Sequence, residues 1–295
     1  MRAAIHRLFY DASQELRNGW WLAIWYVLFS VLRTLAFLLL GPMARGEIGF
    51  RLAQSLALAG SALLCLKLQK RPMRDVGLWP DLRWLREAGL GLVAGLLLMG
   101  LTALTLRALG GFHWEGDGPG TWSALPGVVG LCLAVALVEE LLYRGYLFQR
   151  LVDGLGPWPT QLLMAGYFAF EHWGNPGLLD PTVKAWATLN IGLAAILLGL
   201  CYLRTRSLAL PIGLHFGWNW AQGWLLGFPV SGTLDLSGPL RPVLHAKPTW
   251  LTGGAFGLEG SVLCAGVALG GILLLSRWKG VSADPSTGAA PADRP

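Results

Sequence analysis

Three short groups of ionisable and amide side chains lie inside long apolar segments of the sequence. The groups are Glu139, Glu140 and Arg144; Glu171 and His172; and His215 and Asn219. Ionisable side chains are rare within membrane spans because hydrocarbon cannot solvate them, so they mark function by default. A carboxylate and a histidine activate water, and neighbouring donors stabilise an oxyanion.

Helical spacing separates the roles of these side chains. Glu140 and Arg144 are four residues apart, so they share a helix face and form an ion pair that lowers the cost of both charges. Glu139 is turned about 100° around the helix axis from Glu140, so its carboxylate need not take part in that ion pair. His215 and Asn219 are also four apart, which places an imidazole beside a carboxamide.

The depths of the three groups within their segments agree. Glu139, His172 and His215 lie about 9, 12 and 7 residues from the expected cytoplasmic ends, or roughly 13, 18 and 11 Å at the helical rise. Each group alone would be read as a polar contact between helices, but the agreement of three favours one shared site. The motifs GxSxG and HExxH are absent, so attack by water is expected instead of a covalent intermediate.

The composition places these groups in a membrane protein. The 295 residues are 54% hydrophobic and 14% charged, with a mean hydropathy of +0.51, and a soluble domain could not bury so much apolar surface. Apolar windows of about 20 residues, long enough to cross a bilayer, recur along the chain. They predict an all-α polytopic protein with about eight transmembrane helices, at 19–41, 48–68, 88–109, 125–148, 160–173, 185–203, 208–228 and 251–275.

Basic residues predict the orientation. Of the 23 lysines and arginines, 16 fall in segments on the side of the N-terminus and 5 on the opposite side, with Arg33 and Arg107 inside spans. Because basic residues are retained in the cytoplasm, both termini are predicted to be cytoplasmic, in an integral protein of the cell membrane. This asymmetry accounts for the net charge of +6, and no nucleic-acid partner is expected.

The chain is expected to form one membrane domain over 1–280, followed by a disordered tail at 281–295 that is rich in proline and alanine. No cleavable signal peptide is expected. The four cysteines lie inside predicted spans and are expected to serve apolar packing. The outer segment 229–250 is expected to fold over the outer face. Isolated polar residues inside spans, which are expected to have structural roles, are Arg33, Asn190 and Glu259.

The three groups match the motifs of a known family. Residues 139–144 (EELLYR) resemble its EExxxR motif, 168–172 (FAFEH) its FxxxH motif and 215–219 (HFGWN) its HxxxN motif. In this order and on separate segments, they resemble the CAAX protease and bacteriocin-processing (CPBP, Abi) family of intramembrane proteases, which includes the type II CAAX prenyl endopeptidases. The resemblance covers residues of about 125–228, the extent of the family's protease core.

The resemblance implies a helical fold around a conical cavity open to the cytosol. In it, Glu139 and His172 would activate the water that attacks the scissile carbonyl, and His215 and Asn219 would stabilise the oxyanion. The residues that would hold the site together are Glu140, Arg144 and Phe168. The implied activity is that of an endopeptidase acting on a membrane-associated or lipid-modified protein or peptide, either prenylated or bacteriocin-like.

Two alternatives remain open at the level of sequence. Glu139, His172 and His215 are of the right types to bind zinc, which would make the protein a zinc-dependent metalloprotease. No cofactor is expected, because Asn219 beside His215 suits oxyanion binding better than metal ligation. The other alternative is a non-enzymatic scaffold or transporter that binds a peptide or a cation, although the paired interrupted spans of an inverted-repeat transporter are absent.

Overall fold

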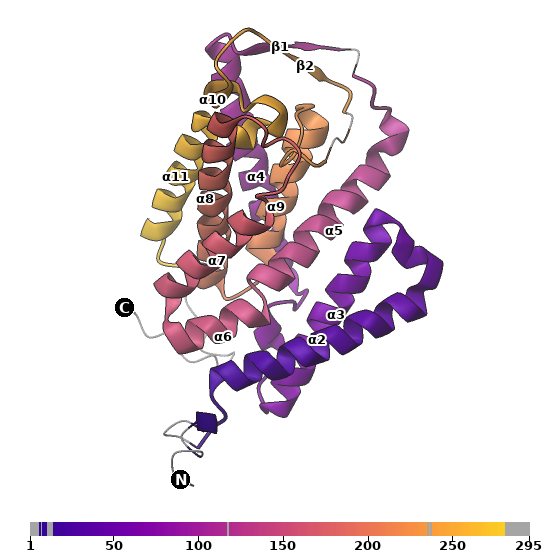
Figure 1. Cartoon of the computed structure of the whole chain (residues 1–295), viewed down its shortest axis with the longest axis vertical. Helices are drawn as coiled ribbons and strands as arrows, with labels where there is room; N and C mark the ends of the chain where they lie inside the picture. Colours follow the sequence, from indigo (N-terminus) through magenta and orange to yellow (C-terminus); the bar gives the residue numbers. More distant parts are fainter. Residues whose placement is uncertain are drawn as a thin grey trace.

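The computed structural model describes residues 6, 8–10, 14–116, 118–234, 236 and 238–280. Most of these residues belong to a bundle of α-helices, as predicted (Figure 1). The predicted disordered tail, 281–295, lies outside the described residues.

Each predicted apolar segment overlaps with at least one helix, although in 251–275 the long helix begins only at Val262. The helices are α2 (Asn18–Leu40), α3 (Glu47–Leu68), α4 (Leu82–Ala108), α5 (Leu125–Tyr143), α6 (Tyr146–Leu155), α7 (Pro157–Glu171), α8 (Pro181–Thr205), α9 (Ala209–Trp220), α10 (Thr249–Thr252) and α11 (Val262–Arg277). Helix α9 continues as a π-helical turn, Ala221–Leu225. Strands β1 (Phe112–Glu115) and β2 (Arg241–Leu244) pair antiparallel at one end of the bundle (Figure 1).

Among the residues that the structure describes, five segments are long and apolar enough to cross a membrane. They comprise α2, α3, α4, α8 and the stretch Trp122–Leu155 that contains α5 and α6. By contrast, α7, α9 and α11 have 15, 12 and 16 residues. These lengths correspond to about 22, 18 and 24 Å, against a hydrocarbon core of about 30 Å. The fold agrees with an all-α polytopic membrane protein, whereas the count of eight full spans stays a prediction.

The predicted segment 125–148 divides into two helices. Helix α5 ends at Tyr143 and α6 begins at Tyr146, with Arg144 and Gly145 between them. A Cβ atom at Gly145 would overlap with the backbone oxygen of Leu141, so the turn requires glycine. The apolar run therefore changes direction one turn after the two glutamates.

Segments predicted to share the cytoplasmic side lie together at the end of the bundle that carries α6 (Figure 1). Arg71, in the connection before α4, pairs with Asp153 of α6 at 3.3 Å. Arg204, at the end of α8, donates to the backbone oxygen of Leu275 near the end of α11 at 3.1 Å. The grouping agrees with the predicted sorting of segments into two sets.

The buried core has two main parts, and the site lies where they meet. One part joins α3 and α5–α8 around Phe148 and Phe168. The other joins α4, α8, α9 and α11 around Met99 and Trp218. All four cysteines are buried and unpaired, which agrees with a packing role.

Helices α4 and α9 pack backbone to backbone through two facing GxxxG motifs, 91–95 (GLVAG) and 213–217 (GLHFG). A Cβ atom at Gly95 would overlap with the backbone oxygen of Leu214, and one at Gly217 with that of Leu92. Small residues allow membrane helices to approach this closely. Because the second motif surrounds His215, this contact fixes the position of that side chain.

We expect Gly95→Val to destabilise the protein by about 1–3 kcal/mol, because a branched side chain cannot fit against α9 without moving it. Thermal unfolding in detergent, followed by circular dichroism, measures the effect. Gly89→Val on the same helix is the matched control, because a Cβ at Gly89 meets no atom within 4 Å. Equal losses in the two variants would contradict the packing argument.

Candidate active site

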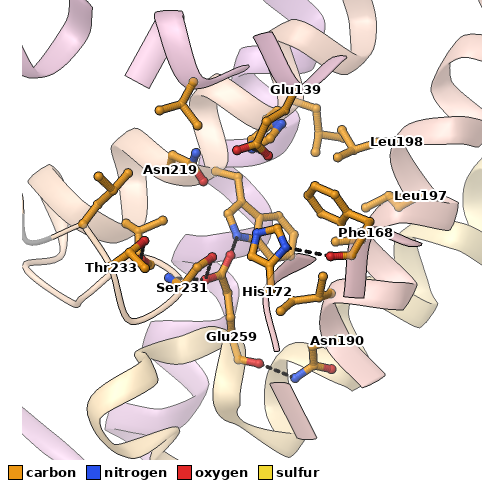
Figure 2. A pocket seen from close by; sticks show the side chains of 18 of the residues that line it. Glu139, Phe168, His172, Asn190, Leu197, Leu198, Asn219, Ser231, Thr233 and Glu259 are labelled. Carbon is orange, nitrogen blue, oxygen red and sulfur yellow. Dashed lines mark hydrogen bonds and ion pairs between the residues drawn. The ribbon is translucent and has the colours of Figure 1, made fainter. Parts of the chain in front are cut away.

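A cavity of about 80 Å³ inside the bundle brings together side chains from several helices (Figure 2). It is lined by the four residues predicted to be catalytic, Glu139, His172, His215 and Asn219, and by Phe168. Glu139 comes from α5, His172 directly follows α7, and His215 and Asn219 lie on α9. This volume accommodates a few water molecules. The structure therefore gathers the predicted residues around one chamber.

The two adjacent glutamates of α5 occupy different environments. The side chain of Glu139 is 22% exposed and lines the cavity, whereas that of Glu140 is fully buried. Oε2 of Glu139 lies 3.7 Å from Nε2 of His215. Glu139 is therefore the carboxylate of this pair that water reaches.

The predicted ion pair between Glu140 and Arg144 is present. Nη1 of Arg144 donates to Oε1 of Glu140 at 3.0 Å, and Nη2 donates to the backbone oxygen of Ala195 on α8 at 2.9 Å. The same Oε1 of Glu140 accepts from Nδ1 of His215 at 2.7 Å. These contacts join α5, α8 and α9, and the link to His215 was missed from sequence because the two residues are 75 positions apart.

Hydrogen bonds fix which ring nitrogen of each histidine carries a proton. The carbonyl oxygen of Phe168 can only accept, so Nδ1 of His172, which lies 2.7 Å away, is the donor. Nδ1 of His215 likewise donates to the carboxylate of Glu140 at 2.7 Å. In both rings Nε2 is left for other partners, because these bonds use the opposite nitrogen.

Phe168 packs beside His172, as the resemblance implied. The two ring centroids are 4.5 Å apart with the planes inclined by 62°. Cζ of Arg144 lies 5.4 Å from the centroid of the Phe168 ring, within the range of a cation–π interaction. Phe168 thus supports the histidine on one side and covers the buried guanidinium on the other.

A second, more open hollow of about 480 Å³ adjoins the cavity and is bordered by α2, α3, α5 and α7. Glu139 and His172 line both hollows, so the two hollows meet at these side chains. Arg51 also lines both. Arg51 lies on α3. We call the second hollow the lateral groove.

Other residues that line the cavity were not assigned to the site from sequence. Asn190 of α8 and Glu259 were expected to have structural roles, and Ser231 and Thr233, from the segments at the β1–β2 end, were missed. Part of the predicted outer segment 229–250 therefore forms a wall of the site. The available signal was Glu259, an acidic residue in an apolar segment, which is the same signal that indicated Glu139.

The zinc alternative finds no ligand set in this arrangement. Among the residues that the structure describes, no group of three or more His, Cys, Asp or Glu side chains is placed to hold a metal ion. Glu139, His172 and His215 share a cavity, and because the protein binds Nδ1 of each histidine, Nε2 is the nitrogen left for a ligand.

Comparison with known families agrees with the motifs. Residues 121–221 match a family model described as type II CAAX prenyl endopeptidase, Rce1-like. This region includes all the site residues predicted from sequence, and the resemblance to the CAAX protease family is confirmed. No curated protein and no solved structure matches the chain. The match supports a CAAX-type intramembrane protease in general.

Proposed function

We propose that the protein is an intramembrane endopeptidase that hydrolyses a peptide bond of a membrane-associated or lipid-modified protein or peptide. The observation that carries this proposal is the convergence of Glu139, His172, His215 and Asn219, from separate helices, on one water-sized cavity. The match of the surrounding region to CAAX prenyl endopeptidases supports the same reaction class.

Glu139 and His172 activate the attacking water. The carboxylate of Glu139 takes a proton from the water as its oxygen attacks the scissile carbonyl carbon. Nε2 of His172 orients the water, because Nδ1 is already bound to the carbonyl of Phe168. Glu139 then returns the proton to the leaving amine, so the peptide bond breaks without a covalent enzyme intermediate.

His215 and Asn219 stabilise the oxyanion that forms on the carbonyl oxygen. Donation from Nε2 of His215 requires the imidazolium form, since Nδ1 already donates to Glu140 at 2.7 Å. The amide of Asn219, one helical turn further along α9, supplies a second donor. Glu140 and Arg144 act on this step indirectly, by holding the ring of His215 in place.

In the proposed topology both termini are cytoplasmic, and eight helices of a single domain over 1–280 lie in the membrane around a protease core at about 125–228. The end of the bundle with α6 faces the cytoplasm, because the basic residues gather there. The substrate enters from the cytoplasmic side. A prenylated protein and a bacteriocin-like precursor both fit this proposal.

Peptides released from membranes of cells that produce the wild-type protein or Glu139→Ala test the proposal. We expect a set of peptides that appears with the wild type and is absent with the variant, measured by mass spectrometry with equal amounts of folded protein. A chelator added to wild-type membranes is expected to leave the release unchanged. A scaffold or transporter predicts identical peptide sets, and loss of release that zinc restores would refute the metal-free mechanism.

A further inference from the structure

The carboxylate of Glu259 has no part in the mechanism above, yet it lines the same cavity (Figure 2). Glu259 is 8% exposed and lies in the short turn Leu258–Gly260 that precedes α11. It also lies outside the region matched by the protease family, 121–221. Burying a carboxylate is costly unless hydrogen-bond donors satisfy it. The donors that bind Glu259 therefore indicate which segments it holds together.

Donors from two other parts of the chain satisfy the carboxylate of Glu259. Oε1 accepts from Nε1 of Trp218 on α9 at 2.8 Å. Oε2 accepts from both the backbone N–H and the hydroxyl of Ser231, at 2.7 and 2.8 Å. Nε2 of Gln222 lies 3.4 Å from the same oxygen. One side chain therefore joins the segment before α11 to α9 and to residues 229–234.

The backbone of Ser231 is held in a strained conformation. Its φ is +50°, in the left-handed region that non-glycine residues rarely adopt. Such residues persist only where their surroundings hold them, and they cluster at functional sites. Since the N–H and the hydroxyl of Ser231 both bind Glu259, this carboxylate is the group that stabilises the strained turn.

The strained turn is connected to both halves of the candidate active site. Nδ2 of Asn175 donates to the backbone oxygen of Ser231 at 2.7 Å, and Asn175 follows His172 by three residues. On the other side, Trp218 directly precedes Asn219 on α9. Glu259 thus stands between the connection that carries His172 and the helix that carries the proposed oxyanion donors.

We propose that Glu259 and Ser231 form a positioning pair that fixes the separation between His172 and the cavity-facing side of α9. This inference rests on the proposed function. It adds two residues, Glu259 and Ser231, that lie outside the family-matched region and on which the geometry of the same site depends. Loss of the carboxylate releases Ser231 from its strained turn and shifts the segment after α7. Water attack then slows, while substrate binding is largely kept.

The positioning pair is tested by steady-state kinetics of the Glu259→Gln variant. The substrate is a peptide that the wild-type protein releases from membranes. Glutamine keeps the shape but turns an N–H₂ group toward donors, so we expect kcat to fall at least about tenfold, as small misplacements of reacting groups do. KM is expected to stay unchanged. Glu87→Gln on α4 is the matched control, because Glu87 is also buried, at 7% exposure, and outside the cavity lining. Its kcat is expected to equal that of the wild type.

Hydrogen–deuterium exchange of the full-length protein in nanodiscs gives a second readout that needs no substrate. We expect faster exchange in Glu259→Gln at both 172–178 and 229–234, and unchanged exchange at both in Glu87→Gln. Should Glu259→Gln fail to fold, Ser231→Ala, which removes only the hydroxyl, serves the same comparison.

Three outcomes overturn the positioning pair: unchanged exchange, faster exchange confined to 229–234, or wild-type kcat in the Glu259→Gln variant. Absence of activity in the wild type is evidence against the proposed function itself. In that case the exchange measurement still decides whether Glu259 connects the two segments, so the two failures are distinguishable.

Discussion

Glu139→Gln is expected to lower kcat by about 100-fold to 10,000-fold, the range that a general base contributes. The carboxamide has the shape of the carboxylate but cannot take a proton from water. The side chain is 22% exposed, so the substitution leaves no newly buried charge and the thermal unfolding temperature should change little. Steady-state rates of purified protein on a released peptide, with circular dichroism of the same samples, measure both quantities.

The contrast with a second carboxylate makes this result specific. Glu87→Gln removes a carboxylate that pairs with Arg83 at 2.8 Å on α4 and does not line the cavity. Its activity should equal that of the wild type. Full activity in Glu139→Gln would rule out Glu139 as the base and with it the mechanism proposed here.

Arg144→Met should be the most destabilising of the substitutions considered, by about 3–5 kcal/mol, because it leaves the carboxylate of Glu140 buried without its cation. Arg144 is 2% exposed and Glu140 is fully buried. The variant also loses the hydrogen bond to Ala195 that joins α5 to α8. Thermal unfolding in detergent is the measurement, with protein yield from membranes as a second indication.

A second ion pair with the same helical spacing supplies the control. Arg51 pairs with Glu47 at 2.6 Å on α3, but the side chain of Glu47 is 57% exposed. Exposed pairs of this kind contribute at most about 1 kcal/mol, so Arg51→Met should unfold at nearly the wild-type temperature. Similar losses for Arg51→Met and Arg144→Met would show that burial does not set the importance of the pair.

Local physical rules were sufficient to predict part of the site. The cost of charge in an apolar segment singled out Glu139 and His215, and four-residue spacing predicted the bond between Glu140 and Arg144. These rules need only neighbouring residues or one helix. They therefore operate on sequence alone.

Other contacts depend on segments that meet only in the folded chain. Nothing near Glu140 indicates that His215 will donate to it, and nothing near Glu259 indicates that it will hold Ser231. A hydropathy window averages the contributions of many residues, so a break at one or two positions does not show in it. The turn at Gly145 between α5 and α6 was therefore not predicted. The GxxxG motifs were readable in the sequence, but only their facing partners show that they set the position of α9.

The lateral groove lies between the residues proposed for chemistry and the helices α2 and α3. The residues proposed for chemistry lie within 121–221, whereas one side of the groove is built by α2 and α3, for example by Phe29, Gln54 and Leu58. A substrate that approaches Glu139 along this path meets those side chains first. Substitutions on the groove side of α2 and α3 should therefore change which peptides reach Glu139 without altering the side chains proposed for hydrolysis.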